Sequence, residues 1–152
     1  MITNQTAVEA LEALETQWES QKAFTQVAVD TVVSAVHGSL TFRDYVFGTL
    51  PSEYGADGAI KIAEALLPLI EETNRAPFYT MLATWYYETG DRELAMVSLV
   101  TSLALDPSYS LSKLIERVFV AGAPEAMFAS MRGELHPKVS GEIFADPELV
   151  IA

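Results

Sequence analysis

The stretch from Pro77 to Pro107 constrains the fold most strongly, because it predicts two helices joined by a tight turn. Pro77 suits the first turn of a helix, where its missing N–H has no helical partner to lose. Gly90 fits a helix end because glycine adopts the left-handed conformation without a Cβ clash, and Asp91 is a good N-cap for the second helix. Pro107 ends that helix, since the residue before a proline avoids the helical region.

The second helix of this hairpin, Leu94 to Leu105, is apolar on nearly all sides. Its polar members, Ser98, Thr101 and Ser102, are all small. A helix of this kind is normally buried on most sides, and it is shorter than the ~20 apolar residues that a membrane span needs. We therefore expect this helix at the centre of the fold.

The hairpin resembles a tetratricopeptide repeat (TPR) in the spacing of its helix-packing residues. The positions that carry the resemblance are Tyr79, Leu82, Ala83, Tyr86, Gly90, Ala95, Leu103 and Pro107. Ser102 departs from the repeat, which usually has alanine there. About one and a half units are visible, whereas a stable array needs at least about three. The resemblance therefore implies a TPR-like hairpin inside a small helical domain.

The longer run from Arg43 to Phe128 resembles the C-terminal part of an uncharacterised actinobacterial and actinophage family, a domain of unknown function. The features that carry this resemblance are the helix led by Pro77 and the runs TGDRELA, ALDPSYSLSKLIERV and AGAPEAM. None of these is a motif with known chemistry. The resemblance therefore implies a helical fold and no particular activity.

Composition limits the compartment and the partner classes. The chain has 152 residues and no cysteine, which fits one domain in the cytoplasm without disulfides or thiolate metal sites. Residues 1–12 lack the pattern of a secretory signal, and every long apolar run is broken by charge or proline, so we expect no membrane association. The net charge of −12 repels phosphate backbones and argues against nucleic acid as a partner. The acidity is expected to aid solubility, and the alternative is an acidic face for a basic partner.

The residues before the hairpin predict further helices. Thr6 and Glu9 form a capping-box pattern that opens a helix after a loose end at residues 1–5. The apolar stripe loosens near Ser20, so the N-terminal arm (residues 1–40) is either one long helix or two with a break there. The β-branched run from Val27 to Val36 favours helix over strand because it lacks strict alternation.

The connecting region, residues 41–76, predicts a short helix, a loop and a longer helix. Thr41 caps the short helix, which ends at Gly48, and residues 49–58 are rich in turn formers and predict a loop. The longer helix spans residues 59–72, with a kink or an early end at Pro68.

After the hairpin, an amphipathic helix from Leu111 to Phe119 is ended by Gly122. Within residues 123–152 we expect a shorter helix from Pro124 to Met131, one more turn at residues 136–143, and an apolar tail that docks on the body or on a partner. Together with residues 77–122, which hold the hairpin and the following helix, these parts predict a single all-α domain of about six to eight helices.

No catalytic, cofactor-binding or metal-ligating residue is assigned, because the usual motifs are absent. The chain lacks a P-loop, a dinucleotide-binding glycine pattern and a nucleophile elbow. His37 and His136 lie far apart in sequence, each at a predicted helix end, and are interpreted as surface or capping residues. Glu71 and Glu72 are adjacent and point to different sides of a helix. We expect no enzyme and no cofactor, with an enzyme whose site is not visible in the sequence as the remaining alternative.

The densest aromatic cluster lies in the first helix of the hairpin. Tyr79 and Tyr86 are expected in the core, and Trp85 and Tyr87 flank Tyr86 and are expected to be exposed. The TPR resemblance would place four residues toward the peptide groove of that repeat, and with Trp85 they form our set of interaction candidates: Thr80, Thr84, Trp85, Tyr87 and Glu88.

These patterns favour a non-catalytic protein–protein interaction or assembly module that associates with a protein partner or with itself, as a homodimer. A partial solenoid leaves apolar ends that need cover. The alternative is an acidic inhibitor or decoy, phage-encoded, that binds a basic host protein.

Overall fold

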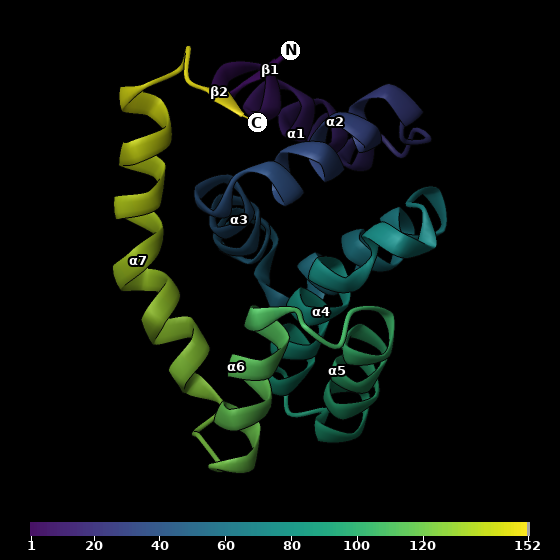
Figure 1. The fold of residues 1–152 in the computed structure, drawn as a ribbon, viewed down its shortest axis with the longest axis vertical. Helices are drawn as coiled ribbons and strands as arrows, with labels where there is room; N and C mark the ends of the chain where they lie inside the picture. The colour runs from purple at the N-terminus through teal and green to yellow at the C-terminus, as the bar shows by residue number, and fades with distance from the viewer. Residues whose placement is uncertain (152) are drawn as a thin grey trace. The chain divides into compact units, whose positions relative to one another are not determined.

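The computed structural model describes residues 1–151, in which seven α-helices and one pair of two-residue strands are connected by short loops (Figure 1). This confirms the predicted all-α fold. The elements are β1 (Ile2–Thr3), α1 (Asn4–Glu19), α2 (Gln26–Gly38), α3 (Leu40–Leu66), α4 (Ala76–Glu88), α5 (Arg92–Leu105), α6 (Ser110–Val120), α7 (Ala126–Ala145) and β2 (Val150–Ile151), with 3₁₀ turns at Leu67–Leu69 and Glu72–Asn74.

The helices form two compact units. Unit 1 contains Met1–Thr49 and the chain from Glu134 onward, and unit 2 contains Leu50–Gly133. Unit 1 is therefore discontinuous in sequence, and unit 2 is continuous. The long helices α3 and α7 each begin in one unit and end in the other.

In unit 1, α1 packs against α2 through buried aliphatic side chains, among them Leu11 and Leu14 of α1 and Val29 and Val32 of α2. From the sequence, residues 1–40 could form either one long helix or two helices with a break near Ser20. The structure has the break. Gln21 adopts a left-handed conformation with φ of 57°, which ends α1.

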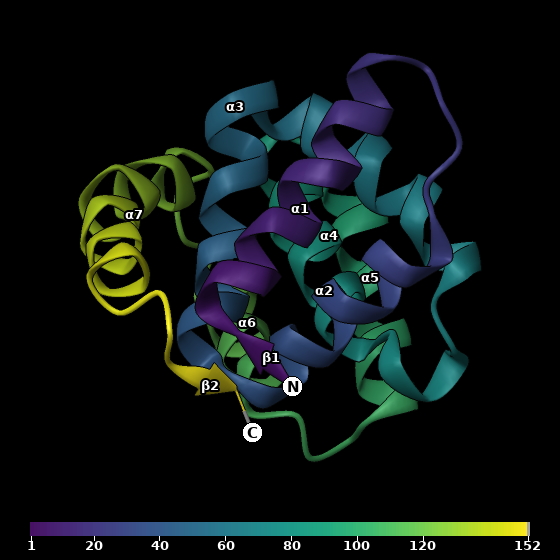
Figure 2. The same cartoon turned by 90° about the horizontal axis from the view of Figure 1, so that it is seen from above.

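The start of α1 is held by residues at the far end of the sequence. Backbone N–H groups of Asn4 and Gln5 donate to the carbonyls of Leu149 and Pro147, both at 2.9 Å. β1 pairs with β2 in antiparallel register, Ile2 opposite Ile151, and Figure 2 shows the two strands side by side. Helix N-termini leave such N–H groups without intrahelical partners, so this segment acts as a backbone cap.

Two expectations for this region are thereby corrected, and one is resolved. Residues 1–5 are not a loose end, and the helix is capped by Thr3, whose side chain accepts from the backbone N–H of Thr6. Thr6 is the N3 member of that capping box rather than its N-cap. The segment after Pro147, for which two docking sites were open, lies on the body of unit 1.

A close approach between α3 and α7 explains why Gly48 lies inside a helix instead of ending one. A Cβ atom at position 48 would lie 2.6 Å from Nδ1 and 3.2 Å from Cβ of His136. Glycine is therefore the residue that this contact accommodates. His136 was predicted at a helix end, but it lies within α7. The centroid of its ring is 5.8 Å from that of Tyr45.

We predict that Gly48→Ala destabilises the protein by a net ~1–2 kcal/mol, because overpacking outweighs the gain in helix propensity. Gly141→Ala is the matched control, since no residue of another element lies within 4 Å of the place that a Cβ atom would take there, and the change should stabilise by about 0.5–1 kcal/mol. Urea unfolding of both variants measures the difference. Equal effects of the same sign would contradict the close contact.

In unit 2, α4 and α5 form the predicted hairpin, and α6 packs on both. Gly90 has φ of 89° at the turn, as expected for a helix end, and Asp91 caps α5 by accepting from the N–H of Leu94 at 3.0 Å. One hydrophobic cluster of this unit is formed by seven buried residues, namely Ala83, Tyr87, Ala95, Leu99, Ile115, Phe119 and Phe128.

The most deeply buried helix of the hairpin is α4 and not α5, which corrects the expectation for residues 94–105. Ten of the thirteen residues of α4 are buried, whereas only Ala95, Ser98, Leu99 and Ser102 of α5 are. Apolar composition does not by itself determine which of two paired helices lies inside. The other side of α5 is exposed.

Two further sequence predictions differ from the structure. Residues 49–58 were expected to form a loop, but they are helical on both sides of a break at Gly55, where φ of 73° and ψ of 167° are non-helical. Residues 126–145 form one helix that continues through Gly133 and Pro137, instead of two short ones. Phe128 and Ile143, near the two ends of this helix, are buried. Their packing offsets the low helix propensity of Gly133 and Pro137. The early helix end at Pro68 is confirmed, because α3 stops at Leu66.

Candidate interaction surfaces

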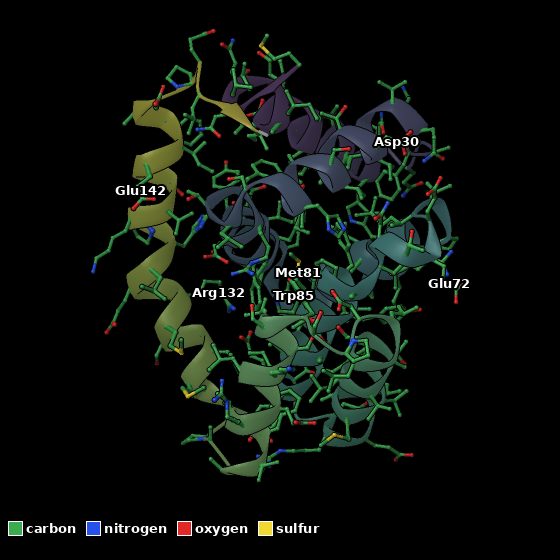
Figure 3. All side chains as sticks on the ribbon, viewed as in Figure 1. Asp30, Glu72, Met81, Trp85, Arg132 and Glu142 are labelled. Carbon is green, nitrogen blue, oxygen red and sulfur yellow. The ribbon has the colours of Figure 1, made fainter. Side chains whose placement is uncertain are left out.

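The five interaction candidates all lie on α4, and the structure places them inside unit 2. Thr80 and Thr84 have no exposed surface, and Trp85 and Tyr87 are 1% and 2% exposed. The expectation that Trp85 and Tyr87 are exposed is therefore wrong, and it is Tyr79 and Tyr86 that are partly exposed. Trp85 is labelled among the helices in Figure 3.

The hydroxyl of Thr80 belongs to a buried network that connects three helices. The oxygens of Thr80, Ser102 and Ser112 lie 2.7–2.8 Å from one another, and Thr80 and Ser102 also reach the carbonyl of Ala76 at 2.9 and 2.8 Å. Three hydroxyl protons are available for five close contacts, so at most three of these contacts are two-centre hydrogen bonds at any one time. The network fixes α4, α5 and α6 relative to one another and gives Ser102, the departure from the TPR pattern, a structural role.

The ring of Tyr87 is enclosed on several sides. It stacks on Phe119 with centroids 4.4 Å apart and an interplanar angle of 9°, and it meets Phe128 edge-on at 5.7 Å. The guanidinium of Arg92 lies 4.3 Å from the ring centroid, and the hydroxyl donates to the carbonyl of Ala123. This side chain is a packing centre of unit 2.

Glu88 forms a bidentate ion pair with Arg132, in the second turn of α7. The distances from the guanidinium nitrogens to the carboxylate oxygens are 2.9 and 3.0 Å, and the two side chains are only 13% and 15% exposed. Thr84 donates to the carbonyl of Met81 at 2.7 Å. The face of α4 that would line a TPR groove is therefore engaged by residues of the same unit.

Tyr86, in contrast, is partly exposed and donates a hydrogen bond to Glu64. Burial of the phenol is the largest cause that raises the pKa of Tyr86 above its ordinary value, followed by the hydrogen bond to Glu64 and the negative charges of Glu64 and Asp91. The folded protein therefore stabilises the neutral form of the Tyr86 phenol relative to the ionised form.

This shift predicts a loss of stability at alkaline pH. As pH rises above ~10, the unfolded chain releases the phenol proton while the folded chain keeps it, so the free energy of unfolding falls. Tyr86→Phe lacks this contribution, and its stability should fall less between about pH 9 and pH 11, measured by urea unfolding. Tyr79→Phe controls for the loss of a tyrosine from the same helix. Parallel pH profiles for wild type and Tyr86→Phe would refute the assignment.

The first surface that sequence reasoning missed is the outer face of α5. Leu94, Met96, Val97 and Val100 are 42%, 43%, 55% and 57% exposed, and we call these four residues the α5 face. No charged residue occurs between Glu93 and Asp106. The sequence signal was this absence of charge, which also fits a buried helix and was interpreted that way.

The second surface is a groove of about 210 Å³ in unit 1. One wall is α1, with Gln5, Val8, Glu9 and Glu12, and the other is the end of α7 and the following turn, with Ile143, Phe144 and Pro147. Phe144 is 59% exposed. The charged residues that line the groove are both acidic. No sequence pattern indicated it, because the two walls are far apart along the chain.

Within residues 1–151, no group of three His, Cys, Asp or Glu residues is arranged to hold a metal ion. The same residues include no helix that is both long enough and apolar enough to cross a bilayer.

The fold and these surfaces define an all-α protein of two compact units with exposed apolar and acidic faces. The chain belongs to the family described as domain of unknown function DUF4192, which matches residues 3–126. The match begins well before Arg43, so it includes α1 and α2, and it ends at the first residue of α7. No curated protein and no solved structure matches the chain.

Proposed function

We propose that this chain is a non-catalytic protein–protein interaction module that self-associates through the α5 face. The observation that carries the proposal is an uncharged helix whose exposed side is lined by large apolar side chains, Leu94, Met96, Val97 and Val100. Contiguous exposed apolar surface of this kind is typical of interaction sites, whereas single exposed apolar residues are ordinary.

A second copy of the chain suits this face for two reasons. Two molecules that each carry a net charge of −12 repel one another, and an uncharged contact surface keeps their acidic side chains apart. Antiparallel pairing of two α5 helices would also bring Arg92 of each copy to the end of the helix where Asp106 lies in the other copy. One helix face is smaller than the ~800 Å² per partner of a standard interface, so we expect a weak dimer.

The TPR resemblance bears on which side of the hairpin is used. In the repeat, peptides bind on the side to which Thr80, Thr84, Tyr87 and Glu88 would contribute. Those residues are engaged within unit 2, so the proposed interface lies on the opposite helix of the hairpin. The TPR-like part of the proposal thus concerns the shape of the scaffold and not the peptide groove.

The test is sedimentation velocity over a range of concentrations. The wild type is expected to shift from monomer to dimer, and Val97→Lys with Val100→Lys to remain monomeric, because buried ammonium groups oppose association. Val27→Lys with Val120→Lys is the matched control, since both valines are 79% exposed outside the α5 face. A monomeric wild type at all concentrations, or equal effects of the two pairs, would overturn the proposal.

The second candidate function is an acidic inhibitor or decoy that binds a basic protein. The groove in unit 1, with Glu9 and Glu12 on its wall, is the observation that favours it. Salt separates the two functions, because screening weakens an exposed charged contact far more than an apolar one.

A further inference from the structure

We infer that the groove in unit 1 binds a cationic amphipathic segment of a partner protein, with an apolar side chain on its floor and Lys or Arg side chains against its acidic wall. This surface is separate from the α5 face, and the inference rests on the second candidate function and not on self-association. The inference rests on the size of the groove, the arrangement of its charges and the exposure of its aromatic residue.

The size of the groove indicates side chains rather than a cofactor. Its volume of about 210 Å³ is below the ~300 Å³ at which pockets for small molecules begin. Its floor includes Val8 and Ile143, which are 6% and 1% exposed. A floor of this size and composition accommodates one or two apolar side chains of a docked segment.

The charges that line the groove favour a positively charged partner segment. Gln5, Glu9 and Glu12 are spaced by four and three residues, so they lie along one face of α1. Glu9 accepts a hydrogen bond from Gln5 at 3.1 Å and keeps further acceptor sites on its carboxylate. Among residues 1–151 no basic side chain lines the groove, so a cation above it meets the carboxylates of Glu9 and Glu12.

The start of α1 also borders the groove, and a free helix N-terminus would attract an anion instead. Here the N–H groups of Asn4 and Gln5 already donate to Leu149 and Pro147, and the side-chain amide of Asn4 donates to the carbonyl of Asp146 at 3.0 Å. These donors are therefore engaged, and the two glutamates dominate the local charge.

Phe144 completes the match to a cationic segment. Its ring is 59% exposed at the rim and meets Tyr45 edge-on at 6.0 Å. Aromatic rings attract Arg and Lys, whose aliphatic stems also cover apolar surface. The groove thus offers an apolar floor, an aromatic rim and an acidic wall to one amphipathic segment.

Fluorescence anisotropy tests this with a labelled helical peptide of Leu and Lys and a second peptide in which Glu replaces every Lys. The full chain is expected to bind the Lys peptide and not the Glu peptide. Glu9→Gln with Glu12→Gln should raise Kd about 2- to 30-fold, from two exposed ion pairs. Glu53→Gln with Glu116→Gln removes the same charge from exposed positions in unit 2 and should change Kd less than about twofold.

Absence of binding, comparable binding of the Glu peptide, or equal weakening by both pairs of substitutions would overturn the inference. Equal weakening would mean that net charge alone attracts the peptide. Phe144→Ala should also weaken binding, through loss of the aromatic rim. The Val97→Lys, Val100→Lys variant is expected to bind the peptide normally, so the outcome is independent of the proposed dimer.

Discussion

Replacing Tyr87 with alanine is expected to lower the free energy of unfolding by about 3–5 kcal/mol, the range for a large aromatic removed from a core. The ring fills the space between Phe119 and Phe128, and Arg92 lies over it. Its removal leaves a cavity bordered by two aromatic rings, which cannot close without moving α6 or the start of α7. Urea unfolding followed by circular dichroism measures the loss.

Tyr87→Phe is the matched control, because it keeps the ring and removes only the hydroxyl that donates to the carbonyl of Ala123. One net hydrogen bond corresponds to about 0.5–1.5 kcal/mol. The difference between the two variants then isolates the contribution of the ring. If alanine costs no more than phenylalanine, Tyr87 is not the packing centre that the contacts describe.

The second large effect is expected at the ion pair of Glu88 and Arg132. Glu88→Ala leaves the Arg132 side chain, which is 15% exposed, without its carboxylate. Because the pair is part-buried, the loss should be at or below the about 3–5 kcal/mol that removing one partner of a buried pair costs. The penalty arises mainly from the remaining charge, since attraction within such a pair is largely offset by desolvation of both groups.

A double-mutant cycle tests that reasoning. Glu88→Leu with Arg132→Met removes both charges and keeps apolar volume, and it should be more stable than Glu88→Ala alone. Chemical denaturation of Glu88→Leu, Arg132→Met and the double variant gives the coupling energy. Additive losses would show that the two side chains act independently, contrary to the two short contacts between them.

Local signals predicted the hairpin well. Pro77, Gly90 and Asp91 act through the backbone of their own helix ends, so their effects are readable from a few neighbouring residues. The helix after the hairpin and its end near Gly122 followed from the same kind of signal.

Burial was predicted less well, because it depends on which helices surround a segment. α5 was expected at the centre of the fold because it carries no charge from Leu94 onward, yet α4 is the more deeply buried helix. Thr80 and Thr84 are satisfied by hydrogen bonds that link them to carbonyls and to Ser102 and Ser112. A polar residue that finds partners is buried at little cost. The carbonyl partners of Thr80 and Thr84 belong to α4 itself, whereas Ser102 and Ser112, the other partners of Thr80, lie on α5 and α6.

The exposure expected for Trp85 and Tyr87 was wrong for the same reason. Their exposure was inferred from one helix considered alone, in which Trp85, Tyr86 and Tyr87 cannot all face one side. In the structure α4 is covered on several sides, so neighbouring positions are buried together. The groove in unit 1 needs residues from α1 and the end of α7, a pairing that no local pattern in the sequence indicates.

The cap that residues 146–151 place on α1 has a consequence for the order of folding. During synthesis, all of unit 2 has been made once Gly133 has left the ribosome. The N-terminus of α1 can be capped only after Leu149 and Ile151 have also been made. Closing the intervening loop costs less when it is shorter, by about 0.6 kcal/mol for each halving of its effective length. If unit 2 folds first, the flexible connection between the two separated parts of unit 1 is shorter, and the cap on α1 forms at a lower entropic cost.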